Sequence, residues 1–276
     1  MCLQSPDGVD RSHRLAPFHI PEPDPRSRRQ PATHIGLDTE VASAVPEAIY
    51  TARMLTPRLM VFAIAVAALA SAQDHVSFAT QDRGLIYADV YGTGDRGVVL
   101  AHGGQFNKES WEKQARELVA HGFRVVAFDF RGFGQSHGPG QADLFTAPMH
   151  LDVLAAVRYL RKSGAKTVAV VGASFGGSAA ANAAEAEPGE IDRVVLLAAG
   201  PGDQPEKLKV PKLLIIARDD SNDDGPRLPR IRVDWDKVPA PKEMIVLGGS
   251  AHAQFLFETN QADRVMQEIL RFLSSQ

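Results

Sequence analysis

The sequence predicts an α/β fold in which helices cover both faces of a mostly parallel, eight-stranded sheet. From Val76 onward, short runs rich in β-branched residues alternate with amphipathic segments of helical length. This alternation is typical of parallel strands that are joined by helices. The link between the sixth and seventh expected strands, residues 200–210, is also short. A large lid inserted at that point is therefore excluded.

Eight runs are predicted as strands because they are apolar or β-branched and end at Gly, Pro or polar residues. Residues 81–84, Gln-Asp-Arg-Gly, separate the first two runs and predict an antiparallel hairpin. The expected strands are residues 76–80, 85–91, 98–101, 124–130, 168–171, 193–198, 212–217 and 244–247.

Four segments of helical length lie between or after these strands. Asn107 is placed to cap the first, because an asparagine side chain accepts a hydrogen bond from the first helical turn. The last segment has an apolar face that includes Val265, Ile269 and Phe272. The expected helices are residues 108–121, 142–163, 177–187 and 260–274.

The first 72 residues differ in composition from the rest of the chain. Residues 1–53 carry scattered Pro, Arg, Ser and Asp with no apolar period, which predicts a disordered or non-native extension. Residues 54–72 have a basic head, a short apolar core and the small-residue exit Ala70-Ser71-Ala72, as a secretory signal peptide does. We therefore expect a periplasmic or secreted protein. An uncleaved membrane anchor is the alternative, although the apolar run is shorter than the roughly 20 residues that span a bilayer.

Composition limits what the remaining chain can be. Cleavage after Ala72 would leave 204 of the 276 residues, which suits a single domain over residues 73–276. The only cysteine is Cys2, so we expect no disulfide in that domain. The net charge is −3 and no dense basic run follows Arg58, which argues against a nucleic-acid partner. The histidines show no metal-site spacing, so no bound metal is expected. The expected partner is a small-molecule substrate.

Ser174 is the candidate nucleophile. It lies in Gly-Ala-Ser-Phe-Gly, residues 172–176, where a β-rich run becomes a helix-prone one. Glycines on both sides permit a tight strand-to-helix turn that exposes the hydroxyl. A second match, residues 134–138, contains Ser136 but continues into Pro139 and Gly140, which start a turn rather than a helix. We therefore expect Ser136 to be a loop residue.

A serine needs a base, a residue that orients the base, and donors for the oxyanion. His252 follows the last expected strand on a Gly-rich loop and is the candidate base. Three carboxylates can orient it: Asp220 is favoured because it closely follows a strand, and Asp219 and Asp203 remain alternatives.

The oxyanion donors are expected to be main-chain amides. Phe175 directly follows the nucleophile and supplies one of them. The turn after the third expected strand supplies the other, with Gly104 favoured over Gln105. His102 precedes this turn and is expected to brace it rather than act as a second base.

The chain resembles the α/β-hydrolase superfamily over nearly all of residues 73–276. Five pieces carry the resemblance and occur in the superfamily's order: residues 102–104, 129–134 and 172–176, then Asp220 and His252. The resemblance implies a three-layer α/β-hydrolase fold and a serine hydrolase that forms an acyl-enzyme without a metal or organic cofactor. It also implies that residues 129–134 form a structural turn. Ala217 stands where many members have Gly before the acid.

The short link at residues 200–210 makes the chain similar to compact, lidless members, among them carboxylesterases, dienelactone-hydrolase-like enzymes and peptidase-like proteins. The function predicted from the sequence is hydrolysis of a solvent-accessible carboxylic ester. An amidase, a peptidase or an acyltransferase would use the same three side chains, and the sequence does not separate them. A binding protein on an inactive hydrolase fold is a further alternative, against which the complete set of Ser174, Asp220 and His252 argues.

Overall fold

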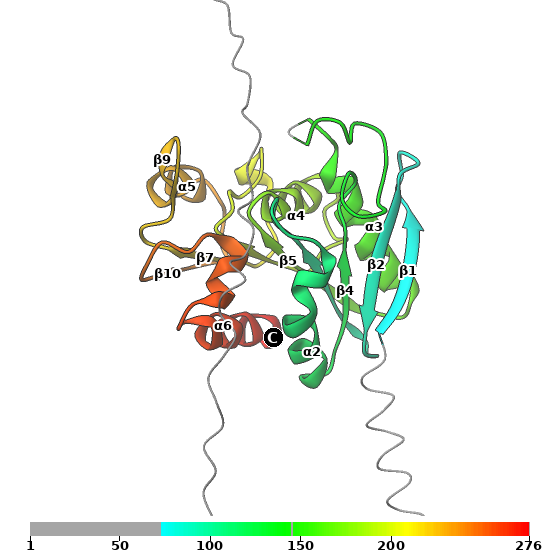
Figure 1. Ribbon diagram of the computed structural model, residues 1–276. Helices are drawn as coiled ribbons and strands as arrows, with labels where there is room; N and C mark the ends of the chain where they lie inside the picture. The colour runs from blue at the N-terminus through cyan, green and yellow to red at the C-terminus, as the bar shows by residue number, and fades with distance from the viewer. Residues whose placement is uncertain (1–72, 145, 276) are drawn as a thin grey trace, which may run out of the picture. The chain divides into compact units, whose positions relative to one another are not determined.

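The computed structural model describes residues 73–144 and 146–275 (Figure 1). Their main feature is a sheet of eight strands in the order β1-β2-β4-β3-β5-β6-β7-β10. The strands are β1 (Gln73–Ala79), β2 (Leu85–Tyr91), β3 (Arg96–Ala101), β4 (Phe123–Phe128), β5 (Thr167–Ala173), β6 (Arg193–Leu197), β7 (Lys212–Ala217) and β10 (Lys242–Leu247). The predicted extension and signal peptide, residues 1–72, lie outside the described residues.

The sheet confirms the predicted fold class. Strand β1 pairs antiparallel with β2, as the hairpin prediction required, and β2 pairs antiparallel with β4. All pairs from β4 through β3, β5, β6 and β7 to β10 are parallel. Eight strands of one sheet were expected, and each matches a strand of the structure to within a few residues at either end.

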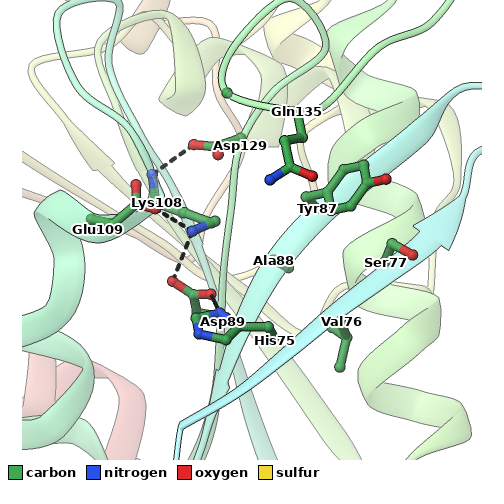
Figure 2. Close-up of a pocket in the computed structure, with 11 residues that line it drawn as sticks. His75, Val76, Ser77, Tyr87, Ala88, Asp89, Lys108, Glu109, Asp129 and Gln135 are labelled. Carbon is green, nitrogen blue, oxygen red and sulfur yellow. Dashed lines mark hydrogen bonds and ion pairs between the residues drawn. The ribbon is translucent and has the colours of Figure 1, made fainter.

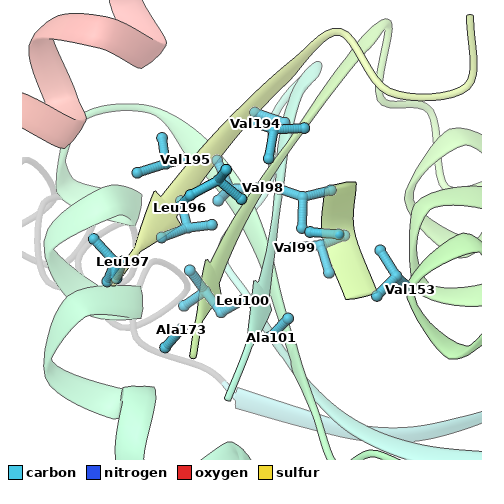
Figure 3. Close-up of a cluster of buried hydrophobic side chains, with 14 of the residues drawn as sticks. Val98, Val99, Leu100, Ala101, Val153, Ala173, Val194, Val195, Leu196 and Leu197 are labelled. Carbon is cyan, nitrogen blue, oxygen red and sulfur yellow. The ribbon is translucent and has the colours of Figure 1, made fainter. Parts of the chain in front are cut away.

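Helices cover both faces of the sheet. Helices α3 (Met149–Lys162) and α4 (Phe175–Ala186) pack together on one face, and α2 (Glu112–Ala120) and α6 (Ala262–Ser274) lie on the other (Figures 1 and 3). Strands β3 and β6 are buried from both sides as a result. All their residues after the first are buried, among them Val98, Leu100, Val195 and Leu197 (Figure 3). Continuous apolar runs of this kind are what a covered parallel sheet requires.

Short elements complete the fold. They are the 3₁₀ helices η1 (Lys108–Trp111), η2 (Pro205–Lys207) and η3 (Ala253–Glu258), the two-residue strands β8 (Ser221–Asn222) and β9 (Gly225–Pro226), and helix α5 (Arg227–Trp235). Only η2 lies between β6 and β7, which confirms that no large lid is inserted there. No helix within residues 73–144 and 146–275 is both long and apolar enough to cross a membrane.

One predicted helix begins later than expected, and one helix was not predicted. The helix expected from residue 142 begins at Met149, because Pro148 disfavours helical geometry in the residue before it. Helix α5 was missed. Its sequence contains Pro229 within the first turn, where a proline is tolerated because the backbone N–H there has no helical partner. The cap was predicted correctly: the Asn107 side chain accepts a hydrogen bond from the Ser110 amide.

The residues of the predicted structural turn, 129–134, are held by a buried arginine. The Arg131 guanidinium is fully buried and forms ion pairs with Asp152 at 2.6 Å and Asp82 at 2.6 Å. The hydrogen bond from Arg131 lowers the pKa of Asp82 to about 2. These contacts agree with a structural role for the turn.

The chain order places two turns side by side. Strand β3 lies between β4 and β5, so the connections that leave β3 and β5 diverge at the same edge of the sheet. In open parallel sheets, ligands bind at such a point, outside the carboxyl ends of the strands. His102 directly follows β3 and Ser174 directly follows β5. The topology alone therefore brings the two turns of interest together.

Glycines permit the close approach between these turns. A Cβ atom on Gly176 would lie 2.4 Å from the His102 carbonyl oxygen and 2.7 Å from that of Ala101. A Cβ atom on Gly172 would lie 2.5 Å from the Gly176 carbonyl oxygen. Both contacts are with backbone, which cannot move aside without shifting a strand or a helix. The first turn of α4 therefore packs against the end of β3 only with glycine at these positions.

His102 braces the turn after β3, as predicted. Its side chain is fully buried, its Nδ1–H donates to the Gly103 carbonyl oxygen at 2.9 Å, and its Nε2 accepts from the Phe130 amide at 3.2 Å. One donating and one accepting nitrogen define a neutral imidazole. Burial lowers the pKa of His102 to about 4. The ring is therefore a structural, uncharged link between two turns.

We expect Gly176→Ala to lower the free energy of unfolding by about 2 kcal/mol or more, because overpacking against backbone is not relieved by a rotamer change. Gly248→Ala is the matched control, since a Cβ atom there would meet no atom within 4 Å. The control should change the free energy of unfolding by less than about 0.5 kcal/mol. Urea denaturation of both variants measures the difference. Equal stabilities would contradict the packing argument.

The low pKa of His102 predicts a loss of stability in mild acid. Above pH 6.5 the ring is neutral in both folded and unfolded chains, so its contribution to stability is fully present. Between pH 6.5 and about 4 the unfolded chain gains a proton that the folded protein does not, and the free energy of unfolding falls by about 3 kcal/mol. His102→Gln removes this proton uptake. Denaturant titrations at pH 7, 5.5 and 4.5 give the free energy of unfolding at each pH. This free energy should fall less steeply with decreasing pH in the variant than in the unmodified protein. An equal fall in both proteins would refute the assignment.

Candidate active site

Ser174 occupies a strained position between β5 and α4. Its backbone has φ 53° and ψ −125°, in the left-handed half of conformational space that non-glycine residues rarely adopt. Its amide donates to the Leu197 carbonyl oxygen at 2.9 Å, and its own carbonyl accepts from Gly177 at 2.9 Å. These bonds hold the strain in place. The turn thus has the strand-to-helix context that was expected for a nucleophilic serine.

Three predicted side chains are brought together in one hydrogen-bonded line. Oγ of Ser174 lies 2.8 Å from Nε2 of His252, and Nδ1 of His252 lies 2.7 Å from Oδ2 of Asp220. A carboxylate only accepts, so Nδ1–H donates to Asp220 and Nε2 accepts from the serine hydroxyl. The exposed fraction is 1% for the Asp220 side chain and 25% for that of His252. The Asp220 carboxylate is therefore shielded from water, whereas the imidazole of His252 is partly exposed to it.

The three candidate acids are clearly separated by the structure. Asp220 is the one that contacts His252. Asp219 is exposed, and its amide donates to the Gly249 carbonyl oxygen at 3.0 Å, which ties the strand end to the last loop. Asp203 is exposed and accepts from the Asn182 side chain at 3.0 Å. Geometry thus favours Asp220 over both alternatives.

The expected oxyanion donors lie beside Ser174. A Cβ atom on Gly103 would lie 3.4 Å from Cβ of Ser174, and one on Gly104 would lie 3.6 Å from the Phe175 ring. Within the described residues, the amides of Phe175, Gly104 and Gln105 donate to no other protein group. Phe175 is the first residue of α4, where the helix leaves amides without helical partners. These amides are free to meet a substrate oxygen.

Gln254 is a residue of the site that the sequence analysis missed. Its side chain is buried, its Oε1 accepts from the Gly103 amide at 2.8 Å, and its Nε2 donates to the Ser110 hydroxyl at 2.8 Å. It thus links the loop that carries His252 to the turn that carries Gly104. No local pattern marks this role, because a glutamine in a loop is ordinarily solvated.

Ser136 has a structural role. The residue is buried, and its hydroxyl oxygen accepts a hydrogen bond from the Tyr87 amide at 2.9 Å. The backbone of the next residue, His137, pairs with Leu85. The second pentapeptide match therefore fixes a loop against β2, as the expectation of a loop residue implied.

A cavity of about 340 Å³ opens beside Ser174. One wall is the start of α4 with Ser174, Phe175 and Ser178, and a second is the end of β6. Helix α5 forms the third wall through residues 227, 230, 231 and 234. This volume is at the lower end of the range for small-molecule sites. The space next to the candidate nucleophile therefore suits a compact substrate group.

A second cavity, of about 540 Å³, lies at the turn that follows β3. It is lined by Gly104 and Gln105 together with Phe106 and Phe133. Of the aromatic residues near the site, Trp111 is buried in the core and packs edge-on against Phe257. Two aromatic side chains thus line this cavity, whereas Trp111 belongs to the core.

A cavity of about 490 Å³ near the outer edge of the sheet has a different character (Figure 2). The buried carboxylate of Asp89 is held there by His75 Nδ1 at 2.6 Å and by Lys108 Nζ at 3.1 Å (Figure 2). Lys108 also pairs with Glu109, and its amide donates to Asp129 at 2.8 Å. Each of these three carboxylates thus has a protein partner. No candidate nucleophile, base or oxyanion donor lines it.

Residues 73–144 and 146–275 contain no group of three or more His, Cys, Asp or Glu side chains that could hold a metal ion. Of the site residues predicted from the sequence, the structure brings together Ser174, His252, Asp220, Phe175 and Gly104. Gln105 lies beside them on the wall of the second cavity.

Comparisons with known proteins agree with this architecture. Residues 97–220 match the family model described as the alpha/beta hydrolase fold. The chain is 32% identical over 131 residues to a non-heme chloroperoxidase of Streptomyces lividans, which covers 46% of this chain and 41% of that protein. It is 29% identical over 116 residues to a pimeloyl-[acyl-carrier protein] methyl ester esterase of Pectobacterium atrosepticum, which covers 42% of each. An epoxide hydrolase of Caballeronia sordidicola is 32% identical over 99 residues, 35% of this chain and 29% of that protein. The matches thus span less than half the length of each relative.

Solved structures extend the likeness to about three quarters of the chain. An esterase of Pyrococcus furiosus superimposes with a TM-score of 0.60 at 20% sequence identity, and the match covers 75% of this chain and 92% of that one. An esterase of Exiguobacterium antarcticum gives a TM-score of 0.58 at 17% identity, over 73% of this chain and 100% of that one. At such identities the likeness shows the fold alone. Sheet order, family match and structural neighbours agree that the described residues have the α/β-hydrolase fold.

Proposed function

We propose that the protein is a serine hydrolase that cleaves carboxylic esters through an acyl-enzyme. Ser174 acts as nucleophile, His252 as general base and acid, and Asp220 as the residue that orients the imidazole. The single observation that carries the proposal is the hydrogen-bonded line from Ser174 Oγ through His252 to buried Asp220, at 2.8 and 2.7 Å. The 2.8 Å distance is within the reach that proton transfer from the serine requires, and the 2.7 Å hydrogen bond orients the imidazole.

In the first half-reaction, Nε2 of His252 takes the hydroxyl proton as Oγ of Ser174 bonds to the substrate carbonyl carbon. The carbonyl oxygen becomes negative and receives hydrogen bonds from the amides of Phe175 and Gly104, with Gln105 as the alternative to Gly104. Asp220 accepts from Nδ1–H and stabilises the imidazolium. His252 then gives its proton to the departing alkoxide, which leaves as an alcohol.

In the second half-reaction, water replaces the alcohol. His252 takes a proton from the water as its oxygen bonds to the acyl carbon, and the same amides stabilise the second oxyanion. The bond between the carbon and Oγ of Ser174 breaks, His252 returns the proton to the serine, and the carboxylic acid is released. No metal or redox group takes part in either half. The 25% exposure of the His252 side chain supports access of water to the site.

The identity of the nucleophile separates two of the reactions that the names of the relatives suggest, ester hydrolysis and epoxide opening. Attack of a serine hydroxyl on an epoxide would give an ether, which water does not cleave under mild conditions. Attack on an acyl carbon gives an ester, which water hydrolyses. Ser174 at the sharp turn therefore favours acyl chemistry over epoxide opening. Amides, or acceptors other than water, would be used by the same residues, and a panel of ester, amide and acceptor substrates ranks them.

We expect Ser174→Ala to abolish labelling by a fluorophosphonate probe and to lower kcat on p-nitrophenyl acetate by a factor on the order of 10⁴ to 10⁶, because the variant lacks the attacking oxygen. Ser136→Ala is the matched control, since that hydroxyl accepts a hydrogen bond from the Tyr87 amide and His252 contacts Ser174 instead. The control should retain labelling and turnover. Labelling that survives Ser174→Ala and disappears with Ser136→Ala would overturn the proposal.

Asp220→Asn should lower kcat by about 10⁴-fold, since an asparagine can hold the imidazole in the wrong tautomer and no longer balances its charge. Asp219→Asn serves as the control, because this neighbour is exposed and contacts the last loop through its backbone. Steady-state kinetics on the same ester compares the two variants. A larger loss for Asp219→Asn would remove Asp220 from the mechanism.

A further inference from the structure

One face of α5 forms a wall of the cavity beside Ser174. Residues 227, 230, 231 and 234 of this helix line the cavity, and this spacing is that of neighbours on a single helical face. The β8–β9 hairpin comes directly after Asp220, and α5 follows the hairpin. Figure 1 shows α5 next to β9. The cavity wall and the orienting acid therefore come from one continuous segment.

Three charged side chains of α5 face this cavity, and two are neutralised by other protein groups. Arg230 donates to the Asn222 side chain at 2.5 Å and to the Gly225 and Pro226 carbonyl oxygens, and it pairs with Asp224 at 3.4 Å. Asp234 pairs with Lys237 Nζ at 2.7 Å. Arg230 thus secures the hairpin, and Asp234 is balanced outside the cavity.

Arg227 is the remaining charge. Its amide donates to the Asp220 carbonyl oxygen at 2.8 Å, and its Nε lies 3.3 Å from Oδ1 of Asp220. Both Nε and Oδ1 are buried, yet their geometry is not that of a hydrogen bond. Within the described residues the two terminal nitrogens of Arg227 donate to no protein group. Its guanidinium is therefore anchored on one side and has unused donors on the other, beside the candidate nucleophile.

We propose that Arg227 binds a carboxylate carried by the substrate, and that the preferred substrates are esters whose acyl portion ends in a carboxylate. This inference rests on the proposed ester hydrolysis. A guanidinium offers two parallel N–H donors that match a carboxylate, and such paired, charge-assisted hydrogen bonds are strong and specific.

The position of His252, the general base, indicates that the acyl portion of the substrate, rather than its alcohol portion, binds in this cavity. The leaving alcohol must lie against Nε2 of His252, which gives it a proton. The residues that line the cavity include Ser174 and Phe175 but not His252. The group that remains bonded to Ser174 in the acyl-enzyme is the acyl group. The cavity of about 340 Å³ has room for an acyl chain of a few carbons that ends in a carboxylate.

The test compares two aryl esters of equal length. Mono-4-nitrophenyl adipate carries a terminal carboxylate, and the 4-nitrophenyl ester of adipic acid monoamide carries an uncharged amide of almost the same shape. The ratio of kcat/KM for the acid to that for the amide, after subtraction of spontaneous hydrolysis, cancels any effect on the shared catalytic residues. For the unmodified enzyme we expect this ratio to be about 10 to 100, as a hydrogen-bonded charge pair gives.

Arg227→Gln should bring the ratio to about 1, because it removes the charge and the paired donors. Arg232→Gln is the matched control: it removes one positive charge from the same helix at an exposed residue that does not line the cavity, and it should keep the full ratio. Arg227→Lys retains the charge without the fork and should keep a reduced ratio above 1. The fluorophosphonate probe checks that each variant has a folded site.

A ratio near 1 for the unmodified enzyme overturns the inference even if no variant folds. So does a loss of the ratio in Arg230→Gln while Arg227→Gln keeps it. Failure of the proposed function looks different: neither ester is hydrolysed and Ser174 is not labelled. Hydrolysis of both esters at equal rates leaves the proposed function intact and removes only the role of Arg227.

Discussion

The close packing of the first turn of α4 against the end of β3 is the constraint on which the site depends. Gly176 lies where a Cβ atom would meet the backbone of Ala101 and His102, so the two turns are nearer than ordinary side chains allow. This approach brings Gly104 next to Phe175, the first residue of α4. It also forces Ser174 into a positive φ that only the surrounding hydrogen bonds sustain.

The remaining side chains reach that point from the other end of the chain. Asp220 follows β7 and His252 follows β10, and these strands are parallel neighbours in the sheet. Gln254 then joins the His252 loop to the Gly103 turn by a buried hydrogen bond. Each catalytic candidate thus lies at the same edge of the sheet, where strands end and backbone groups are free. Position in the sheet, rather than proximity along the chain, makes the constellation.

Much of this was predictable because it depends on local patterns. Alternating strands and helices, the glycines around Ser174 and the short link before β7 all leave marks over a few residues. The choice of Asp220 over Asp219 could be favoured but not fixed, since adjacent carboxylates differ only in the direction that the folded turn gives them. Helix α5 was missed because its prolines imitate a loop, and Gln254 because its partners are 144 and 151 residues away. Interactions of that range are set by the tertiary fold.

The compact link between β6 and β7 has a consequence for how members with this layout can diverge. Only η2 lies in that link, and the nine-residue helix α5, which follows β7, walls the cavity beside Ser174. Because that helix begins seven positions after Asp220, a single insertion or deletion between them would shift the acid and reshape the cavity together. New substrate preferences should therefore arise here through point changes on one helical face rather than through changes in length.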